Sequence, residues 1–283
     1  MTSKRLAFCG GGHRQTQLTG QLAIRQRAAV TIEFAPLHDA MTFNSPLSEE
    51  RATRLVDFMA EDLQGTVLDI GCGWGELLLR VVAAAPGAAG LGLDLDVAAL
   101  EHGQTLAARR GLADRMTFVP GDAKETAPEQ ATAVISIGAS HVWAASVDPS
   151  APMDYAGALR AIRARVPRGA RVVYGEAVWS SPPTAEAAAA LGGRLDELIT
   201  VADLVDLAVA TGFVPAAVHE ANLDEWDDFE SKFSAAYAAW LVEHGLDAAD
   251  ADEVRARAQR QRDGYFRGYR GVMGLAYLQL IAV

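Results

Sequence analysis

The fold of this chain is decided by the stretch Thr66-Val67-Leu68-Asp69-Ile70-Gly71-Cys72-Gly73-Trp74-Gly75-Glu76-Leu77-Leu78-Leu79. A β-branched, apolar run comes first, three glycines follow at alternate positions, and apolar residues then return at helical spacing. This order predicts a buried strand, a tight loop and a helix. Glycine adopts positive φ without strain and lets backbone N–H groups approach a ligand, and the helix offers its positive end. The loop therefore indicates a site for a small polar ligand.

The spacing of the three glycines narrows the class of ligand. The dinucleotide-binding fingerprint requires a third glycine where this chain has Glu76, and a carboxylate there would repel a diphosphate. The loop glycines, with Asp69 before them and Asp94 at the end of the next strand, suit an uncharged nucleoside that carries an amino acid. We expect Asp94 to bind the ribose hydroxyls and Asp69 to lie near an ammonium group.

Three further motifs follow the glycine loop, in order and at regular spacing. They are Gly90-Leu91-Gly92-Leu93-Asp94, Phe118-Val119-Pro120-Gly121-Asp122-Ala123 and Ala133-Val134-Ile135-Ser136-Ile137-Gly138. With these motifs the chain resembles the class I S-adenosylmethionine-dependent methyltransferases. The resemblance implies S-adenosyl-L-methionine as the cofactor. The residues that it implies as cofactor contacts are Asp69, Gly71, Cys72, Gly73, Gly75, Asp94, Leu95, Asp122, Ala123 and Gly138.

Strand and helix patterns alternate over the first two thirds of the chain. Such alternation predicts a parallel sheet with right-handed crossovers. Ser48 and Asp96 are predicted helix N-caps, and residues 154–166 predict a further helix. Ligand sites in such a sheet lie beyond the carboxyl ends of the strands, where Glu176 also falls. The predicted strands span residues 66–70, 91–95, 116–119, 134–137 and 171–176.

The last third of the chain departs from this alternation. Residues 213–219 and 273–283 predict two final strands, with residues 222–270 inserted between them as helices. The resemblance implies a Rossmann-like α/β fold with a mostly parallel seven-stranded sheet, an antiparallel C-terminal hairpin and a helical lid, as in a group of small bacterial methyltransferases. Helices that only cover the sheet edge are an alternative. Asp250 and Glu253 predict a capping box for the second inserted helix.

Residues 1–40 look different from the rest of the chain and predict a flexible N-terminal arm. Gly10-Gly11-Gly12 indicates a flexible joint, and basic residues outnumber acidic ones. The arm lacks the apolar segment of a secretory signal and offers few core positions. Residues 41–283 are expected to form the methyltransferase domain, and Met41 is an alternative functional start.

Composition favours a soluble cytoplasmic protein with a small-molecule substrate. The formal net charge is -11 and the pI is near 5.0, which argues against a nucleic-acid surface. Cys9 and Cys72 make no disulfide framework, and no Cys/His spacing predicts a metal site. No apolar run approaches the roughly 20 residues of a membrane span. The oligomeric state is left open.

His141 is the first candidate for a catalytic residue. Methyl transfer is an in-line displacement, and an N, O or S acceptor loses a proton that a base must receive. His141 comes three residues after Gly138, just beyond the fourth strand. A hydrogen-bonded surface or packing histidine is the alternative. Tyr155 and Glu176 are further candidates, with helix packing and strand-end hydrogen bonding as their alternatives.

Three tryptophans are candidates for substrate binding. Trp143, Trp179 and Trp226 fall in the insertion or at the rim, the edge of the sheet formed by the carboxyl ends of the parallel strands. Aromatic faces there favour a cationic centre. Buried packing residues are the alternative. Cys72 is interpreted as a small packing residue rather than a nucleophile, because no base lies near it in the sequence.

These patterns predict an enzyme that transfers a methyl group from S-adenosylmethionine to a small-molecule N, O or S acceptor, without a nucleic-acid or membrane partner. Two alternatives are an enzyme that binds this cofactor without methylating and a non-catalytic nucleoside-binding regulatory protein. A nicotinamide dehydrogenase is disfavoured by Glu76.

Overall fold

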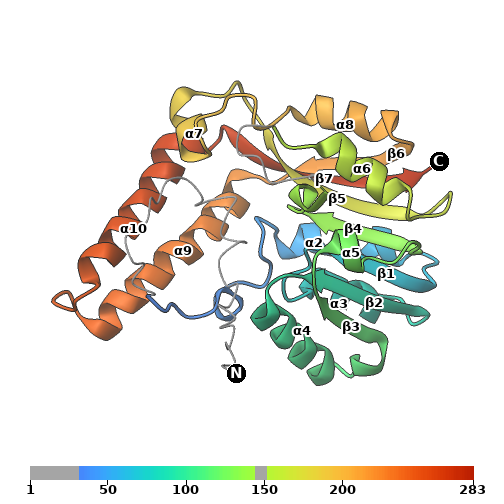
Figure 1. Cartoon of the computed structure of the whole chain (residues 1–283), viewed down its shortest axis with the longest axis horizontal. Coiled ribbons are helices and arrows are strands. Elements are labelled where there is room, and N and C mark those ends of the chain that lie inside the picture. The colour runs from blue at the N-terminus through green and yellow to red at the C-terminus, as the bar shows by residue number, and fades with distance from the viewer. Residues whose placement is uncertain (1–31, 144–151) are drawn as a thin grey trace, which may run out of the picture.

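A seven-stranded sheet forms the centre of the molecule (Figure 1). The computed structural model describes residues 32–143 and 152–283, so Cys9 and the predicted joint at residues 10–12 lie outside the described residues. The strand order is β3-β2-β1-β4-β5-β7-β6. β1 to β5 pair in parallel, whereas β7 runs antiparallel to β5 and β6, which confirms the predicted sheet. The strands are β1 Gly65–Ile70, β2 Ala88–Asp94, β3 Met116–Pro120, β4 Ala133–Ile137, β5 Arg171–Trp179, β6 Phe213–Glu220 and β7 Met273–Ala282.

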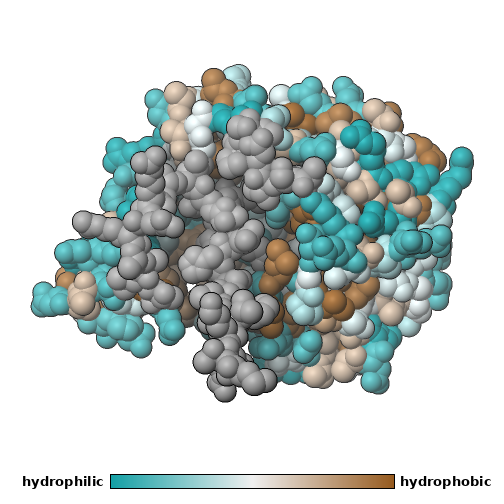
Figure 2. Space-filling model, in the orientation of Figure 1, coloured by the Kyte–Doolittle hydropathy of each residue, from teal (hydrophilic) through white to brown (hydrophobic). Residues whose placement is uncertain are grey.

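Helices pack on both faces of this sheet and bury two apolar cores, while hydrophilic residues cover much of the visible outer surface (Figure 2). On one face, Leu55, Leu78 and Leu100 pack with Val67 of β1. On the other face, helical side chains pack against Leu68 and its neighbours on β4 and β5. Successive side chains of β1 point to opposite faces of the sheet, so Val67 and Leu68 pack in different cores. The first layer contains α2 Glu49–Ala60, α3 Glu76–Ala84 and α4 Val97–Arg109, and the second contains α5 Ala123–Thr126, α6 Tyr155–Arg163 and α8 Val201–Ala210.

Side-chain caps fix where several helices begin. The Ser48 side chain accepts a hydrogen bond from the Arg51 N–H, and the Asp96 side chain accepts one from Ala99, as the sequence predicts. Thr200 and Asp203 form a capping box for α8. Short elements complete this part of the chain: the 3₁₀ helices η1 Leu37–Asp39, η2 Ala113–Arg115 and η3 Ser140–Trp143, and the helix α7 Ala185–Ala190, which the sequence pattern did not predict.

The predicted insertion between the last two strands is helical. It contains α9 Leu223–His244, α10 Ala251–Asp263 and the π-helix η4 Gly264–Tyr269, and Figure 1 shows α9 and α10 side by side, extending away from the sheet. The predicted capping box of α10 is wrong. Asp250 makes no side-chain cap, and the Glu253 carboxylate binds Arg257 and Arg260 instead of the Asp250 backbone. The box lies at the start of α9, between Asn222 and Glu225.

Residues 32–43, which we call the strap, lie along the inserted helix α9. The Phe34 ring meets Tyr237 edge-on with 5.3 Å between ring centroids, and Phe34 also packs on the cluster around Trp240. Further along, Leu37 packs with Met41 in a cluster that includes side chains of α9. The strap thus connects the insertion to the glycine loop region of the sheet.

Candidate functional site

The glycine loop between β1 and α3 is held in the predicted shape by β2. Gly71, Gly73 and Gly75 have φ values of 69°, 55° and 67°, in the left-handed region that favours glycine. The Gly71 N–H donates to the Leu93 carbonyl at 2.9 Å, and the Gly73 N–H donates to Asp94 Oδ2 at 2.7 Å. A Cβ on Gly75 would lie 2.6 Å from the Phe118 ring. Close packing and backbone geometry therefore both require these glycines.

Asp69 and Asp94 bring two buried carboxyl groups to the carboxyl ends of β1 and β2. Their side chains belong to residues that are 5% and 4% exposed. Burial, helped by the charge of Asp94, raises the pKa of Asp69 to about 8. Asp94 Oδ1 also accepts the Asp96 N–H at 2.9 Å, so this carboxylate orders the loop after β2 as well as the glycine loop. A cationic group placed beside Asp69 would favour its ionised form.

We expect the stability of the ligand-free protein to fall as the pH rises from about 4 to 8. Folding raises the pKa of Asp69 from 3.8 to about 8, so in this window the folded state holds a proton that the unfolded chain has lost. One such proton changes the free energy of unfolding by at most about 1.4 kcal/mol per pH unit. Urea unfolding of the wild type and of Asp69→Asn at pH 5.5 and 7.5 measures the effect. The exposed Asp114→Asn is the matched control, and equal pH slopes in all three proteins would contradict the assignment.

The other predicted cofactor contacts follow the same rim. Leu95 directly follows Asp94 and is 56% exposed, so an apolar side chain faces solvent beside the buried acids. Asp122 is the exposed N-cap of α5, with its side chain accepting from the Lys124 N–H, and Ala123 behind it is buried. Gly138 has φ 66° and donates its N–H to the Gly175 carbonyl at 2.7 Å. The rim therefore combines one exposed apolar side chain with polar loop ends.

Cys72 is a packing residue in this structure, as the sequence indicates. A Cβ on Gly92 would lie 2.8 Å from Cys72 Sγ, so the thiol fills the space over β2. Burial raises the pKa of the Cys72 thiol well above its usual range, and the nearby Asp69 and Asp94 add to this effect. A protonated thiol is a poor nucleophile.

His141 lies exposed in η3, directly after β4 and Gly138. Partial desolvation lowers the pKa of this imidazole, and the negative charge of Asp94 acts in the opposite direction. Glu176 is 1% exposed and accepts the Ser140 N–H at 2.6 Å. Tyr155 is 2% exposed and donates its hydroxyl to the Ala177 carbonyl at 3.0 Å. Of the three predicted catalytic residues, the structure brings His141 to the surface and places the other two in the interior.

The predicted substrate-binding tryptophans lie in packed surroundings. Trp143 is partly buried, with the Arg165 guanidinium 4.5 Å from its ring centroid. Trp179 is 5% exposed and donates its indole N–H to the Leu195 carbonyl at 3.0 Å. Trp226 is also 5% exposed. These positions agree better with the alternative of buried packing residues than with an open pocket.

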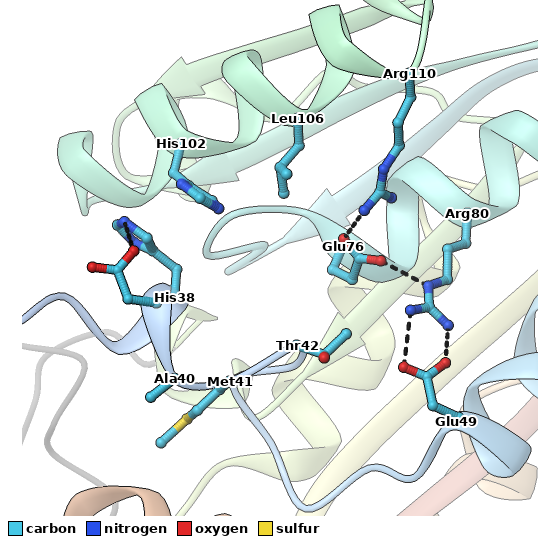
Figure 3. Close-up of a pocket in the computed structure, with 11 residues that line it drawn as sticks. His38, Ala40, Met41, Thr42, Glu49, Glu76, Arg80, His102, Leu106 and Arg110 are labelled. Atoms are coloured by element: carbon cyan, nitrogen blue, oxygen red, sulfur yellow. Dashed lines mark hydrogen bonds and ion pairs between the residues drawn. The ribbon is translucent and has the colours of Figure 1, made fainter. Parts of the chain in front are cut away.

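A cavity of about 360 Å³ lies between α3, α4 and the strap, and none of the predicted cofactor contacts lines it (Figure 3). Glu76 on α3 is central to it and pairs with Arg80 and Arg110, each at 2.7 Å. Its charge is therefore compensated, which removes the repulsion that the sequence argument assigned to it. The lining residues are His38, Asp39, Ala40, Met41, Thr42, Glu49, Glu76, Arg80, His102, Leu106 and Arg110.

Trp74 is a loop residue that the sequence argument did not assign. Its indole N–H donates to the Thr42 carbonyl of the strap at 2.8 Å. Helix α4 approaches so closely that a Cβ on Gly103 would lie 2.7 Å from the Trp74 carbonyl oxygen. The glycine in the middle of a helical pattern was the signal of this close approach. Trp74 thus holds the glycine loop in place by contacts with the strap on one side and with α4 on the other.

Neither a metal cluster nor a membrane-spanning helix is found within residues 32–143 and 152–283. No group of three or more His, Cys, Asp or Glu side chains there could hold a metal ion. Over the same residues, no helix is both long and apolar enough to cross a membrane.

Part of this chain, including the glycine loop, is similar to known methyltransferases. A model of the methyltransferase domain matches residues 67–160. The chain is 36% identical over 112 residues to the release factor glutamine methyltransferase of Bradyrhizobium diazoefficiens, covering 38% of each chain. It is 40% identical over 86 residues to the mitomycin biosynthesis 6-O-methyltransferase of Streptomyces lavendulae, covering 30% of this chain and 24% of that protein. These matches span well under half of either relative.

The whole fold has a counterpart among solved structures. A methyltransferase of Geobacter sulfurreducens, solved in complex with S-adenosyl-L-homocysteine, superposes with a TM-score of 0.74 at 24% identity. The superposition covers 87% of this chain and 96% of that one. The chain thus contains a match to a methyltransferase domain that includes the glycine loop, and it has the fold of solved S-adenosylmethionine-dependent methyltransferases.

Proposed function

We propose that this protein transfers a methyl group from S-adenosyl-L-methionine to an N, O or S atom of a small molecule. The observation that carries the proposal is the pair of buried acids at the glycine loop. Asp94 is fixed by backbone N–H groups beside the exposed Leu95, and Asp69 is a buried acid that a cation would stabilise. The net charge of -11 favours a small acceptor over a nucleic acid. With no disulfide framework in the sequence, the cytoplasm is the proposed setting.

The residues present fit this cofactor. Asp94 would bind the ribose hydroxyls, Leu95 would pack on the base, and Asp69 would lie on the side of the ammonium and sulfonium charges. When bound, S-adenosylmethionine supplies an activated methyl group on a positively charged sulfur. The protein then needs to align the acceptor, exclude water and receive a proton.

His141 is the proposed base for that proton. It is exposed, it follows Gly138 at the end of β4, and its lowered pKa keeps the imidazole neutral and able to accept a proton near pH 7. Tyr155 and Glu176 are weaker candidates because their polar atoms bind backbone groups inside the protein.

S-adenosyl-L-homocysteine should bind to this protein and NADH should not, because the side chain of Glu76 stands where the dinucleotide-binding fingerprint has its third glycine. Loss of charge-assisted hydrogen bonds to the ribose costs on the order of 1.5–3 kcal/mol, so Asp94→Ala should weaken binding at least tenfold. Isothermal titration calorimetry measures this affinity. Unchanged affinity in Asp94→Ala would exclude Asp94 from the site.

Two control variants distinguish the loss of a ligand contact from a distortion of the glycine loop. Asp94→Asn keeps the size of the side chain, and Asp114→Ala removes an exposed carboxylate elsewhere. The catalytic part of the proposal is tested by incubation with S-adenosylmethionine and a metabolite extract. Formation of S-adenosyl-L-homocysteine together with a methylated product is expected. Binding without turnover would favour a non-methylating enzyme or a regulatory protein.

A further inference from the structure

Glu176 is a buried carboxylate in the centre of the sheet whose hydrogen bonds go to the loop that carries His141. It lies on β5 opposite Ala276 of β7 and is 1% exposed. Its Oε1 accepts the Ser140 N–H at 2.6 Å. The backbone N–H groups of Ala139 and Ala177 and the Ser140 hydroxyl bond to the same carboxyl group. Donors from residues 139–140 of this loop, together with one N–H of β5 itself, thus converge on one buried side chain.

Tyr174 holds the loop at a second point. Its hydroxyl, buried on the same strand, hydrogen-bonds the Ser140 hydroxyl. Both the backbone and the side chain of Ser140 are therefore fixed by β5. Ser140 is itself fully buried, and it opens the 3₁₀ helix in which the exposed His141 is the next residue. The direction in which His141 leaves the backbone is set by these contacts.

We propose that Glu176 is a positioning residue, whose carboxylate fixes the backbone at residues 139–140 and so holds His141 in place beyond the carboxyl end of β4. The inference rests on the proposed function, because it assigns His141 the role described there. The lone pairs of this carboxylate already accept hydrogen bonds from the loop. Glu176 therefore holds the loop in place and does not receive the proton of the acceptor. Small displacements of a reacting group can cost about 10²-fold in rate.

The first test needs no acceptor and no turnover. The Hε1 NMR signal of His141 is identified as the histidine signal that disappears in His141→Ala. Glu176→Ala should change the chemical shift of this signal and move its titration midpoint up toward 6.5, because a released loop is better hydrated and desolvation lowers the wild-type value. Glu176→Gln, which keeps one oxygen acceptor, should give a smaller change. An unchanged His141 signal in Glu176→Ala would overturn the proposal.

The second test uses turnover once an acceptor is found. Glu176→Ala should lower kcat by ten- to hundredfold on the scale of such displacements, with S-adenosyl-L-homocysteine affinity within about twofold, and Glu176→Gln should recover much of the rate. The control is Gln279→Met, a buried polar residue of β7. If Glu176→Ala does not fold, Glu176→Gln and Tyr174→Phe carry the test. A parallel loss of affinity and rate in these variants would indicate a structural role only.

The two proposals fail in distinguishable ways. Absence of cofactor binding would contradict the proposed function, and the NMR result would still decide whether Glu176 positions His141. A normal rate and pH profile in Glu176→Ala would contradict the positioning role while leaving methyl transfer intact.

Discussion

Replacing Arg51 with alanine should lower the free energy of unfolding by about 3–5 kcal/mol, the usual cost of leaving one partner of a buried ion pair alone. The Arg51 side chain on α2 is 9% exposed and that of Glu225 on α9 is 4% exposed. Two nitrogens of Arg51 donate to the carboxylate, at 2.8 and 2.9 Å, and one also donates to the Glu220 carbonyl. This pair joins the first helical layer to the base of the insertion. Urea unfolding at pH 7 measures the loss.

The pH dependence of this loss follows from the pKa of Glu225. Burial alone would raise that pKa, but hydrogen bonds from Arg51, Ser48 and Asn222 outweigh burial and lower it to about 2. A lowered folded-state pKa stabilises the protein above the unfolded value of 4.5, and this contribution is lost as the pH falls toward 2. In Arg51→Ala the uncompensated carboxyl group takes up its proton more readily. The difference in the free energy of unfolding between the wild type and Arg51→Ala should therefore be largest near neutrality and should shrink below about pH 4.5.

Arg54 provides a matched control on the same helix. It pairs with Glu50 at 2.9 Å, but the two side chains are 49% and 83% exposed. Arg54→Ala should cost less than about 1 kcal/mol, as exposed pairs do. The double variant Arg51→Met with Glu225→Gln should recover part of the loss, because it leaves no uncompensated charge. A cost of Arg51→Ala similar to that of Arg54→Ala would show that the pair contributes little.

The parts of the fold that the sequence predicted depend on local chemistry. The glycine loop followed from three glycines that adopt positive φ, and the strand that precedes it followed from an apolar run. Ser48 and Asp96 were predictable as caps because an N-cap needs only a short polar side chain before a helical pattern. The order of the motifs also predicted the parallel part of the sheet. Parallel strands bring the loops at their carboxyl ends to the same edge, and each motif ends in such a loop.

The contacts that the sequence did not reveal join residues far apart in the chain. Arg51 and Glu225 are separated by 174 positions, and no periodicity marks them as partners. Glu253 matched the capping-box pattern, but basic residues one and two turns later compete for its carboxylate. Trp226 and Tyr155 carry both apolar and polar atoms, so their residue type alone did not distinguish a pocket from a core. Only the structure shows which of their surfaces are covered.

The second large effect on stability comes from the strap, residues 32–43. A chain that begins at Met41 should be less stable than one that begins at Ile32 by about 2–4 kcal/mol. Ile32 and Phe34 pack against the Trp240 cluster, and Leu37 packs against Met41 and Trp74. Full burial of one large apolar side chain contributes about 1.5–3 kcal/mol, and these three are partly buried. At about 2–4 °C per kcal/mol for a chain of this size, the thermal midpoint should fall by about 4–16 °C.

The comparison isolates residues 32–40, because both chains lack everything before residue 32. Phe34→Ala in the full chain should reproduce part of the loss, since it removes the ring that meets Tyr237, whereas Phe266→Ala, at a 59% exposed residue, should change the midpoint little. The sequence alone predicts the opposite result, a stable domain from Met41 onward. Equal midpoints for the two truncated chains would support that prediction. A lower midpoint would show that the domain includes residues 32–40, because Ile32, Phe34 and Leu37 then stabilise the fold through their contacts with the clusters that contain α9 side chains.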